Sequence, residues 1–159
     1  MYDKEAYKRY AGAFSHLHVK VTFGKRAPHK AIMLLSIIDL VETGVITSNH
    51  ILYTQQLDSQ FYNNWARYIA FMDGHSARSA VPFFHLAYEP FWSLKLKPSC
   101  PYSEKELADA RIYMKPAKMN EAIECAIIDQ DLFELLQDNY VRAQYRVLLI
   151  SLYCTYKQP

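Results

Sequence analysis

The sequence predicts a mainly α-helical protein with a small β-hairpin or short strands, folded as a single compact helical domain around a buried central helix at about residues 28–43. Three observations lead to this prediction. Apolar residues recur at helical spacing over several long stretches, only four glycines are available for tight turns, and 51% of the 159 residues are hydrophobic. A chain of this length and composition can bury a substantial core in one domain.

The central helix is predicted from the stretch KRAPHKAIMLLSIIDLVETG, residues 25–44. Within residues 32–41 only a serine and an aspartate are polar, so apolar side chains face nearly every direction. A helix that is hydrophobic all round belongs inside a core. Pro28 suits the first helical position, and Gly44 suits the left-handed residue that ends a helix.

The other elements are predicted from the same periodicity. Residues 3–18 favour an amphipathic helix, and a second long helix is expected from Thr54 or Gln55 to Phe71. VITSNHILYT suggests a short hairpin or two brief extended pieces, and DGHSARSA a surface loop. FFHLAYEPFWSLKL suggests two short strands that turn at residues 88–90, the second with a basic and an apolar face. Further helices are expected at about 103–111, 117–127, 130–138 and 140–156.

Four basic residues crowd the start of the central helix: Lys25, Arg26, His29 and Lys30. The helix dipole favours anions there, so each cation costs about 0.3–1 kcal/mol at an exposed site. Such a helix start either holds an anion such as a phosphate or carries solvated cations. Residues 1–30 contain seven Lys/Arg against two Asp/Glu, and residues 104–159 contain seven against nine. One basic edge on a near-neutral body favours a polyanion-binding face.

Motifs of common enzymes are absent from the sequence. It contains no GxxxxGK[ST], GxGxxG or HExxH pattern. The three widely spaced cysteines are expected to be ordinary thiols of a reducing compartment. The polar N-terminus and the lack of an apolar run of 18 residues predict a soluble, cytoplasmic protein without membrane contact. We therefore expect no enzymatic activity, no cofactor, no metal site and no small-molecule substrate.

Four blocks occur in an order that resembles a known family: APHKAIMLLSIIDLVETGVI, a helix with Phe61 and Trp65, VPFFHLAYEPFWSL, and RAQYRVLLISLY. From about residue 10 to 155 the chain is similar to the sulfur-binding domain of McrA-like, phosphorothioate-dependent type IV restriction endonucleases, which usually join it to an HNH nuclease. That domain recognises DNA in which sulfur replaces a non-bridging phosphate oxygen. The resemblance implies double-stranded phosphorothioate DNA as the partner. It also implies that residues 1–159 form one recognition domain without a nuclease domain, so that a fused or separate HNH nuclease supplies catalysis.

The resemblance further implies a sulfur pocket with two walls. His29 and Lys30 form one wall, and Val81, Pro82 and His85 form the other. Apolar rings and aliphatic stems suit polarisable sulfur, whereas a phosphate oxygen buried there is poorly solvated, so selectivity also comes from penalising oxygen. The Lys30 stem is expected to cover the sulfur while its ammonium meets a neighbouring negative charge. At Lys30, Val81 and His85 the family often has an arginine, an aromatic and a small residue, so this chain departs from the family pattern there.

Flanking residues are expected to contact the DNA backbone or bases: Lys20, Lys25, Arg26, Arg78, Lys95 and Lys97, with Ser79 as a polar helper. Arg142 and Arg146 are expected instead to pair with nearby acids or carbonyl groups. Two alternatives stay open at the level of sequence. One is a basic helical domain that binds unmodified duplex DNA through its phosphates. The other is a protein–protein interaction domain without a nucleic-acid role, in which the basic residues form a solvated edge.

Overall fold

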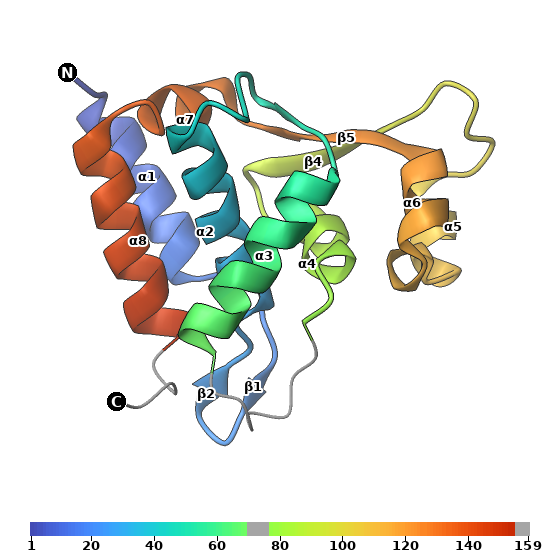
Figure 1. The fold of residues 1–159 in the computed structure, drawn as a ribbon, viewed down its shortest axis with the longest axis horizontal. Helices are drawn as coiled ribbons and strands as arrows, with labels where there is room; N and C mark the ends of the chain where they lie inside the picture. Colours follow the sequence, from blue (N-terminus) through green and yellow to red (C-terminus); the bar gives the residue numbers. More distant parts are fainter. Residues whose placement is uncertain (70–76, 155–159) are drawn as a thin grey trace.

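The structure is a computed structural model that describes residues 1–69 and 77–154. Its central helix is α2 (His29–Glu42), in which eleven of the fourteen residues are buried. Three further helices pack against α2 (Figure 1): α3 (Gln55–Tyr68), α4 (Ala80–His85) and α8 (Asn139–Tyr153). The prediction of a helix enclosed by the core is confirmed, because a helix that is apolar on all sides needs neighbours on all sides.

The ends of α2 match the sequence signals closely. Pro28 was predicted as the first helical residue, and in the structure it is the N-cap directly before the first helical residue, His29. The N–H that proline lacks would have no intrahelical partner at either position. Gly44 follows the helix with φ +79°, the left-handed conformation that glycine adopts without strain. The acids Asp39 and Glu42 near the C-terminal end are compensated by Arg146 of α8, whose guanidinium lies 2.8 Å from a carboxylate oxygen of each.

Arg142, one turn before Arg146, is also engaged within the protein. Its side chain is nearly buried, donates to the Leu136 carbonyl at 2.7 Å and to the Glu42 carboxylate at 3.2 Å, and bonds Asn139 as well. The expected pairing of Arg142 and Arg146 with nearby acids and carbonyl groups is thus confirmed. Together the ion pairs of Arg142 with Glu42 and of Arg146 with Asp39 and Glu42 fasten α8 to the end of α2.

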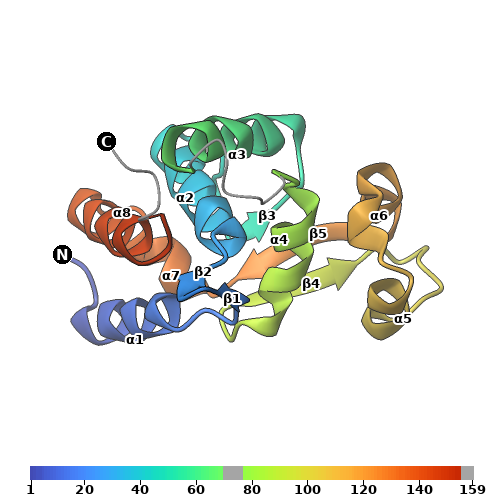
Figure 2. The same ribbon diagram turned by 90° about the horizontal axis from the view of Figure 1, so that it is seen from below.

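The helix α1 (Lys4–Ser15) lies beside α8 and completes the helical layer (Figures 1 and 2). The Asp3 carboxylate caps α1 by accepting the N–H groups of the next turn. The Tyr7 and Tyr145 rings stack with centroids 5.2 Å apart, and the Tyr145 hydroxyl donates to the Tyr7 carbonyl at 3.0 Å. This contact joins the two ends of the chain.

A three-stranded antiparallel sheet packs beside the helices. Its order is β3 (His50–Ile51), β5 (Ile123–Ile128) and β4 (Trp92–Leu96), with β5 in the middle. In β4 the side chains alternate between buried or half-buried and exposed, with Lys95 on the exposed face, as expected for its basic and apolar faces. The short helix α7 (Gln130–Leu135) follows β5 and leads into α8.

Two smaller units project from this body. A hairpin of β1 (Val21–Thr22) and β2 (Lys25–Arg26) precedes α2. Beyond the end of β4 and the start of β5, a lobe stands away from the helical layer (Figure 1). It consists of α5 (Glu104–Asp109), the 3₁₀ turn η2 (Ile112–Met114) and α6 (Pro116–Ala122).

The mainly helical fold with small antiparallel β elements is confirmed, but three local predictions are wrong. VITSNHILYT contributes only β3, which pairs with β5 instead of forming a hairpin. The segment before residues 88–90 forms α4 and the 3₁₀ turn η1 (Leu86–Tyr88), not a strand. The predicted helix 117–127 stops at Ala122, so Cys125 lies on β5.

The physical reason is the same for the last two errors. Short apolar runs have no decisive periodicity, so their partners in the fold choose between helix and strand. The segment with Phe83 and Phe84 buries both rings as one helical turn, whereas the β-branched run of β5 lies between two strands. The predicted helix ends at Phe71 and residue 156, and the first part of the DGHSARSA loop, lie outside the described residues.

Within residues 1–69 and 77–154, no helix combines the length and apolar character needed to cross a membrane.

Candidate functional site

A cavity of about 240 Å³ lies where the start of α2 meets α4. Figure 2 looks onto this end of the molecule, where the hairpin β1–β2, the start of α2 and α4 come together. Its walls include all five residues predicted for the sulfur pocket, namely His29, Lys30, Val81, Pro82 and His85. The remaining wall residues are His18, Val19, Lys20, Ala27 and Tyr88. The structure therefore brings the two predicted walls together, and their role in binding sulfur stays a prediction.

The wall from α4 is held in place by its neighbours in the core. Pro82 occupies the first turn of α4, where a missing N–H costs no helical hydrogen bond. The next two side chains, Phe83 and Phe84, are fully buried, and the Phe83 carbonyl accepts a hydrogen bond of 3.1 Å from the Trp92 indole of β4. Val81, Pro82 and His85 therefore sit on a rigid turn. A rigid apolar surface is what a weakly hydrogen-bonding ligand atom requires.

Lys30 uses its charge inside the protein. Only 6% of this residue is exposed, and its ammonium donates to Glu89 Oε2 and to the His18 carbonyl oxygen, each at 2.7 Å. Its nitrogen also lies 5.9 Å from the centre of the Tyr88 ring. The negative charge that Lys30 meets in this structure is thus an internal carboxylate. Lys30 also lines the cavity, and the expectation that its stem covers a sulfur atom stays a prediction.

Glu89 is the residue that sequence reasoning missed. Its side chain is 1% exposed and accepts three hydrogen bonds: from Lys30, from the His18 N–H at 2.8 Å and from His18 Nδ1 at 3.1 Å. A buried carboxylate requires such partners. One signal was available, because Glu89 is the single acid in the apolar block VPFFHLAYEPFWSL. Its partners are 59 and 71 residues away, so the sequence does not identify them.

His85 forms a half-buried aromatic part of the wall. Its ring stacks on Tyr88 with centroids 5.8 Å apart and lies 4.3 Å from the Tyr113 ring. Burial, and secondarily the positive charge of Lys30, lower the pKa of His85 below its usual value. The imidazole is therefore uncharged near neutral pH. On the other wall, the His29 ring lies 4.9 Å from the ring of Trp65.

Three of the predicted DNA-contacting residues lie on the hairpin or directly before it. Lys20 lines the cavity, and the Ala27 N–H donates to the Lys20 carbonyl at 2.8 Å, which closes the base of the hairpin. Arg26 donates to the Ser15 carbonyl at 3.2 Å, and its guanidinium lies 5.5 Å from the Tyr153 ring. Lys25 lies on the same strand and is exposed. The structure thus groups Lys20, Lys25 and Arg26 on one element.

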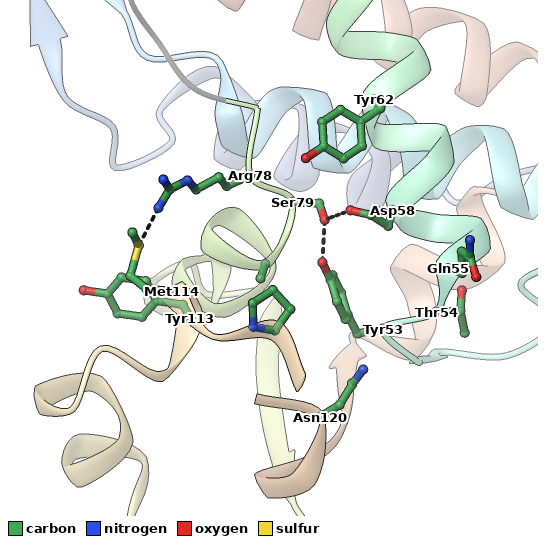
Figure 3. A pocket seen from close by; sticks show the side chains of 12 residues that line it. Tyr53, Thr54, Gln55, Asp58, Tyr62, Arg78, Ser79, Tyr113, Met114 and Asn120 are labelled. Atoms are coloured by element: carbon green, nitrogen blue, oxygen red, sulfur yellow. Dashed lines mark hydrogen bonds between the residues drawn. The ribbon is translucent and has the colours of Figure 1, made fainter. Parts of the chain in front are cut away.

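Arg78 and Ser79 line a different cavity, of about 610 Å³ (Figure 3). Ser79 is buried, and its hydroxyl bonds both the Tyr53 hydroxyl and the Asp58 carboxylate. Arg78 is exposed, and its guanidinium reaches the Met114 sulfur at 3.7 Å. The structure does not bring these two predicted contacts to the first cavity.

Lys95 and Lys97 also lie outside the wall of the 240 Å³ cavity. The Lys95 ammonium pairs with Glu124 of the neighbouring strand β5 at 2.9 Å. Lys97 follows β4, and its N–H donates to the Ala122 carbonyl at 2.8 Å, at the start of the outer lobe. These flanking basic residues are therefore distributed over three parts of the molecule, and Lys20 is the one among them that lines the cavity.

In the part of the chain that the structure describes, no three His, Cys, Asp or Glu side chains are grouped to hold a metal ion. His16 and His18, which are two residues apart and could form a metal-binding pair, bind different partners. His16 Nδ1 lies 2.9 Å from the Gly12 carbonyl oxygen, and His18 binds Glu89.

The fold and the cavity define a small helical domain with a cavity at the start of its central helix. In the cavity wall, the charge of Lys30 is compensated by Glu89, and Lys20 contributes a further positive charge. No family model and no curated protein matches the sequence. Among solved structures, the chain is similar to the sulfur binding domain of SprMcrA complexed with phosphorothioated DNA, with a TM-score of 0.69. The likeness covers 100% of this chain and 92% of that one at 14% sequence identity. This chain therefore has the fold of a sulfur binding domain.

Proposed function

We propose that this protein recognises double-stranded DNA that carries a phosphorothioate linkage, and that the cavity between α2 and α4 receives the sulfur. One observation carries the proposal: five residues from two distant segments form one small cavity in a fold shared with a phosphorothioate-binding domain. In the cell, such a module directs an HNH nuclease of a type IV restriction system, fused or separate, to modified DNA and performs no chemistry itself.

The chemistry of the wall supports a preference for sulfur over oxygen. Sulfur is more polarisable than oxygen and a poorer hydrogen-bond acceptor, so it loses less when it leaves water. The Pro82 ring, the Val81 side chain and the Lys30 stem offer contact surface rather than hydrogen bonds, and the uncharged His85 ring adds no positive charge. The Lys30 ammonium is held by Glu89 and gives an incoming oxygen little compensation for lost water. Discrimination then comes largely from the cost to oxygen.

The residues of the hairpin supply affinity that does not depend on sulfur. Lys20 at the cavity wall and Lys25 on β2 are placed to approach phosphates beside the modified one. Contacts of this kind release counterions from DNA, so affinity falls as salt rises, for modified and unmodified duplexes alike.

The test compares two duplexes of identical sequence, one with a single phosphorothioate linkage and one without, by fluorescence anisotropy at moderate salt. We expect tighter binding to the modified duplex. Equal affinities would leave the first alternative, a domain that binds ordinary DNA phosphates, and failure to bind either duplex at low salt would favour a protein-interaction role.

A variant pair then locates the preference in the cavity. Pro82→Ala should lower the ratio of the two affinities roughly tenfold, because it removes two buried CH₂ groups worth about 0.8 kcal/mol each. Pro98→Ala, at an exposed proline outside the cavity wall, is the matched control and should leave the ratio unchanged. A Pro82→Ala protein that folds and keeps the ratio of the native protein argues against this cavity.

A further inference from the structure

The tip of the hairpin presents a phenylalanine to water. Phe23 is 99% exposed, and its neighbour Val21 is 60% exposed. Full burial of a phenylalanine side chain is worth about 1.5–3 kcal/mol, so this ring contributes none of that to folding. A scattered exposed apolar residue needs no explanation, but here Phe23 lies in the turn of the hairpin and Val21 lies two residues before it on β1.

The backbone conformation of the turn also disfavours a phenylalanine at this position. The pairing of Thr22 with Lys25 leaves Phe23 and Gly24 as the two central residues, with φ of +52° and +75°. A turn with positive φ at both positions favours Asn-Gly or Gly-Gly, and a bulky aromatic at the first position is uncommon. Phe23 therefore occupies a place where neither local backbone preference nor burial favours it.

The surroundings of the tip are cationic and firmly held. Lys20 and Lys25 flank it on the two arms, and Arg26 ties the base of the hairpin to the Ser15 carbonyl and the Tyr153 ring. Phe23 lies three residues from Lys20, which lines the 240 Å³ cavity. At about 3.3 Å per extended residue the ring stands roughly 10 Å beyond the rim, about three base steps along a DNA strand.

We propose that Phe23 is an apolar wedge that inserts into the base stack of bound duplex DNA, a few steps from the linkage held in the cavity. The basic arms fit a polyanion, and apolar side chains that enter a base stack are a known means of kinking DNA. This inference rests on the proposed function for its partner, DNA, but not for the preference for sulfur. The wedge acts on modified and unmodified duplexes equally.

Binding affinities of exposed-residue variants give the first test. Phe23→Ala should weaken binding to both duplexes by roughly 5- to 150-fold, the range for loss of one base–aromatic stack, while the ratio between the duplexes stays as it is. Phe23→Trp should retain most of the affinity. Tyr102→Ala, at an exposed aromatic of the outer lobe, is the matched control and should change neither affinity. Unchanged binding by Phe23→Ala overturns the proposal and leaves a protein partner as the reason for the exposed ring.

The second test reads the DNA directly. A series of duplexes carries 2-aminopurine, which becomes brighter when unstacked, at successive positions from the linkage. The native protein should raise its fluorescence at one or two adjacent positions, and Phe23→Ala should abolish that rise at saturating protein. A flat profile with the native protein overturns the wedge even if sulfur preference is found. A localised, Phe23-dependent rise without sulfur preference supports the wedge and refutes the sulfur pocket.

Discussion

At the scale of single residues, Glu89 decides how the charge of Lys30 is used. The sequence leaves two possibilities for the cations at this helix start, a bound anion or exposure to solvent, yet the Lys30 ammonium is enclosed with the Glu89 carboxylate, which is 1% exposed. Desolvating both charges is costly, and the pair is tolerable because His18 adds two further hydrogen bonds to Glu89. This arrangement fixes the Lys30 stem as a wall of the cavity.

Removal of one partner leaves the other as a buried, uncompensated charge. Glu89→Ala should therefore lower the free energy of unfolding by about 3–5 kcal/mol, whereas the double variant Lys30→Met/Glu89→Leu should recover most of that loss. Glu134→Ala, at an exposed glutamate of α7, should change stability by about 0.5 kcal/mol or less. Urea unfolding followed by circular dichroism measures all three. Similar midpoints for Glu89→Ala and Glu134→Ala would contradict a buried ion pair.

The lowered pKa of His85 predicts a pH dependence of stability. The unfolded chain, with an ordinary histidine pKa of about 6.5, binds a proton more readily than the folded protein, so stability falls as pH drops below about 6.5. His85→Gln should reduce this loss between about pH 7 and pH 5, and His50→Gln, at an exposed histidine, should leave the slope as it is. The measurement is urea unfolding across that range. A slope unaffected by His85→Gln would show that burial does not disfavour its charge.

At the scale of elements, α2 both fills the core and presents the cavity. The helix α2 is buried on nearly all sides and cannot shift easily, because α3, α4 and α8 all pack against it. Interiors are packed like crystals, so a rigid α2 keeps His29 and Lys30 in register with Pro82 of α4. The three ion pairs that Arg142 and Arg146 of α8 make with Asp39 and Glu42 fix the far end of the same helix.

A cavity in the middle of α2 should be costly. Leu35 is 1% exposed, and Leu35→Ala should lower the free energy of unfolding by about 2–5 kcal/mol. The matched control is Leu52→Ala, at a leucine that is 58% exposed, for which a change of about 0.5 kcal/mol or less is expected. Thermal and urea unfolding provide the comparison. Equal effects at the two sites would mean that α2 is not the centre of the core.

At the scale of the whole molecule, the basic edge seen in the sequence is narrower than its count of charges suggests. Residues 1–30 hold seven Lys/Arg, but Arg9 pairs with Asp131 and Lys30 with Glu89. The hairpin beside the cavity keeps a local group of cations. The electrostatic potential at a surface depends on where the charges lie as well as on the net charge. This group of cations therefore steers a polyanion toward one end of the fold.

A salt series tests this distribution of charge. Lys20→Ala, at the cavity rim, should reduce the slope of log affinity against log salt concentration by about 1, because one phosphate contact is lost. Lys105→Ala should leave the slope unchanged. Lys105 lies on α5 in the outer lobe, distant in sequence from the hairpin, and its ammonium pairs with Asp109 at 2.8 Å. Anisotropy titrations with the unmodified duplex suffice. Equal slopes for the two variants would place the DNA elsewhere on the surface.

Local sequence signals were sufficient to predict the central helix, its glycine stop and the long helices α1, α3 and α8. These features depend on periodicity and on residues with special backbone properties, both of which are local. The family resemblance added the expectation that APHK and VPFFHL face each other, and the structure places both at one cavity.

Three features depend instead on contacts that exist only in the folded chain: the extended form of residues 123–128 as β5, the helical form of α4 and the partner of Lys30. Short apolar runs take helix or strand according to their neighbours, and a buried charge finds its partner across many residues of sequence. The separation of Arg78, Ser79, Lys95 and Lys97 from the cavity belongs here too, because exposure and distance exist only once the chain is folded. The sequence of each segment determines which of its side chains can be buried. The packing of the segments against one another determines which charged side chains lie at the surface and can bind a partner.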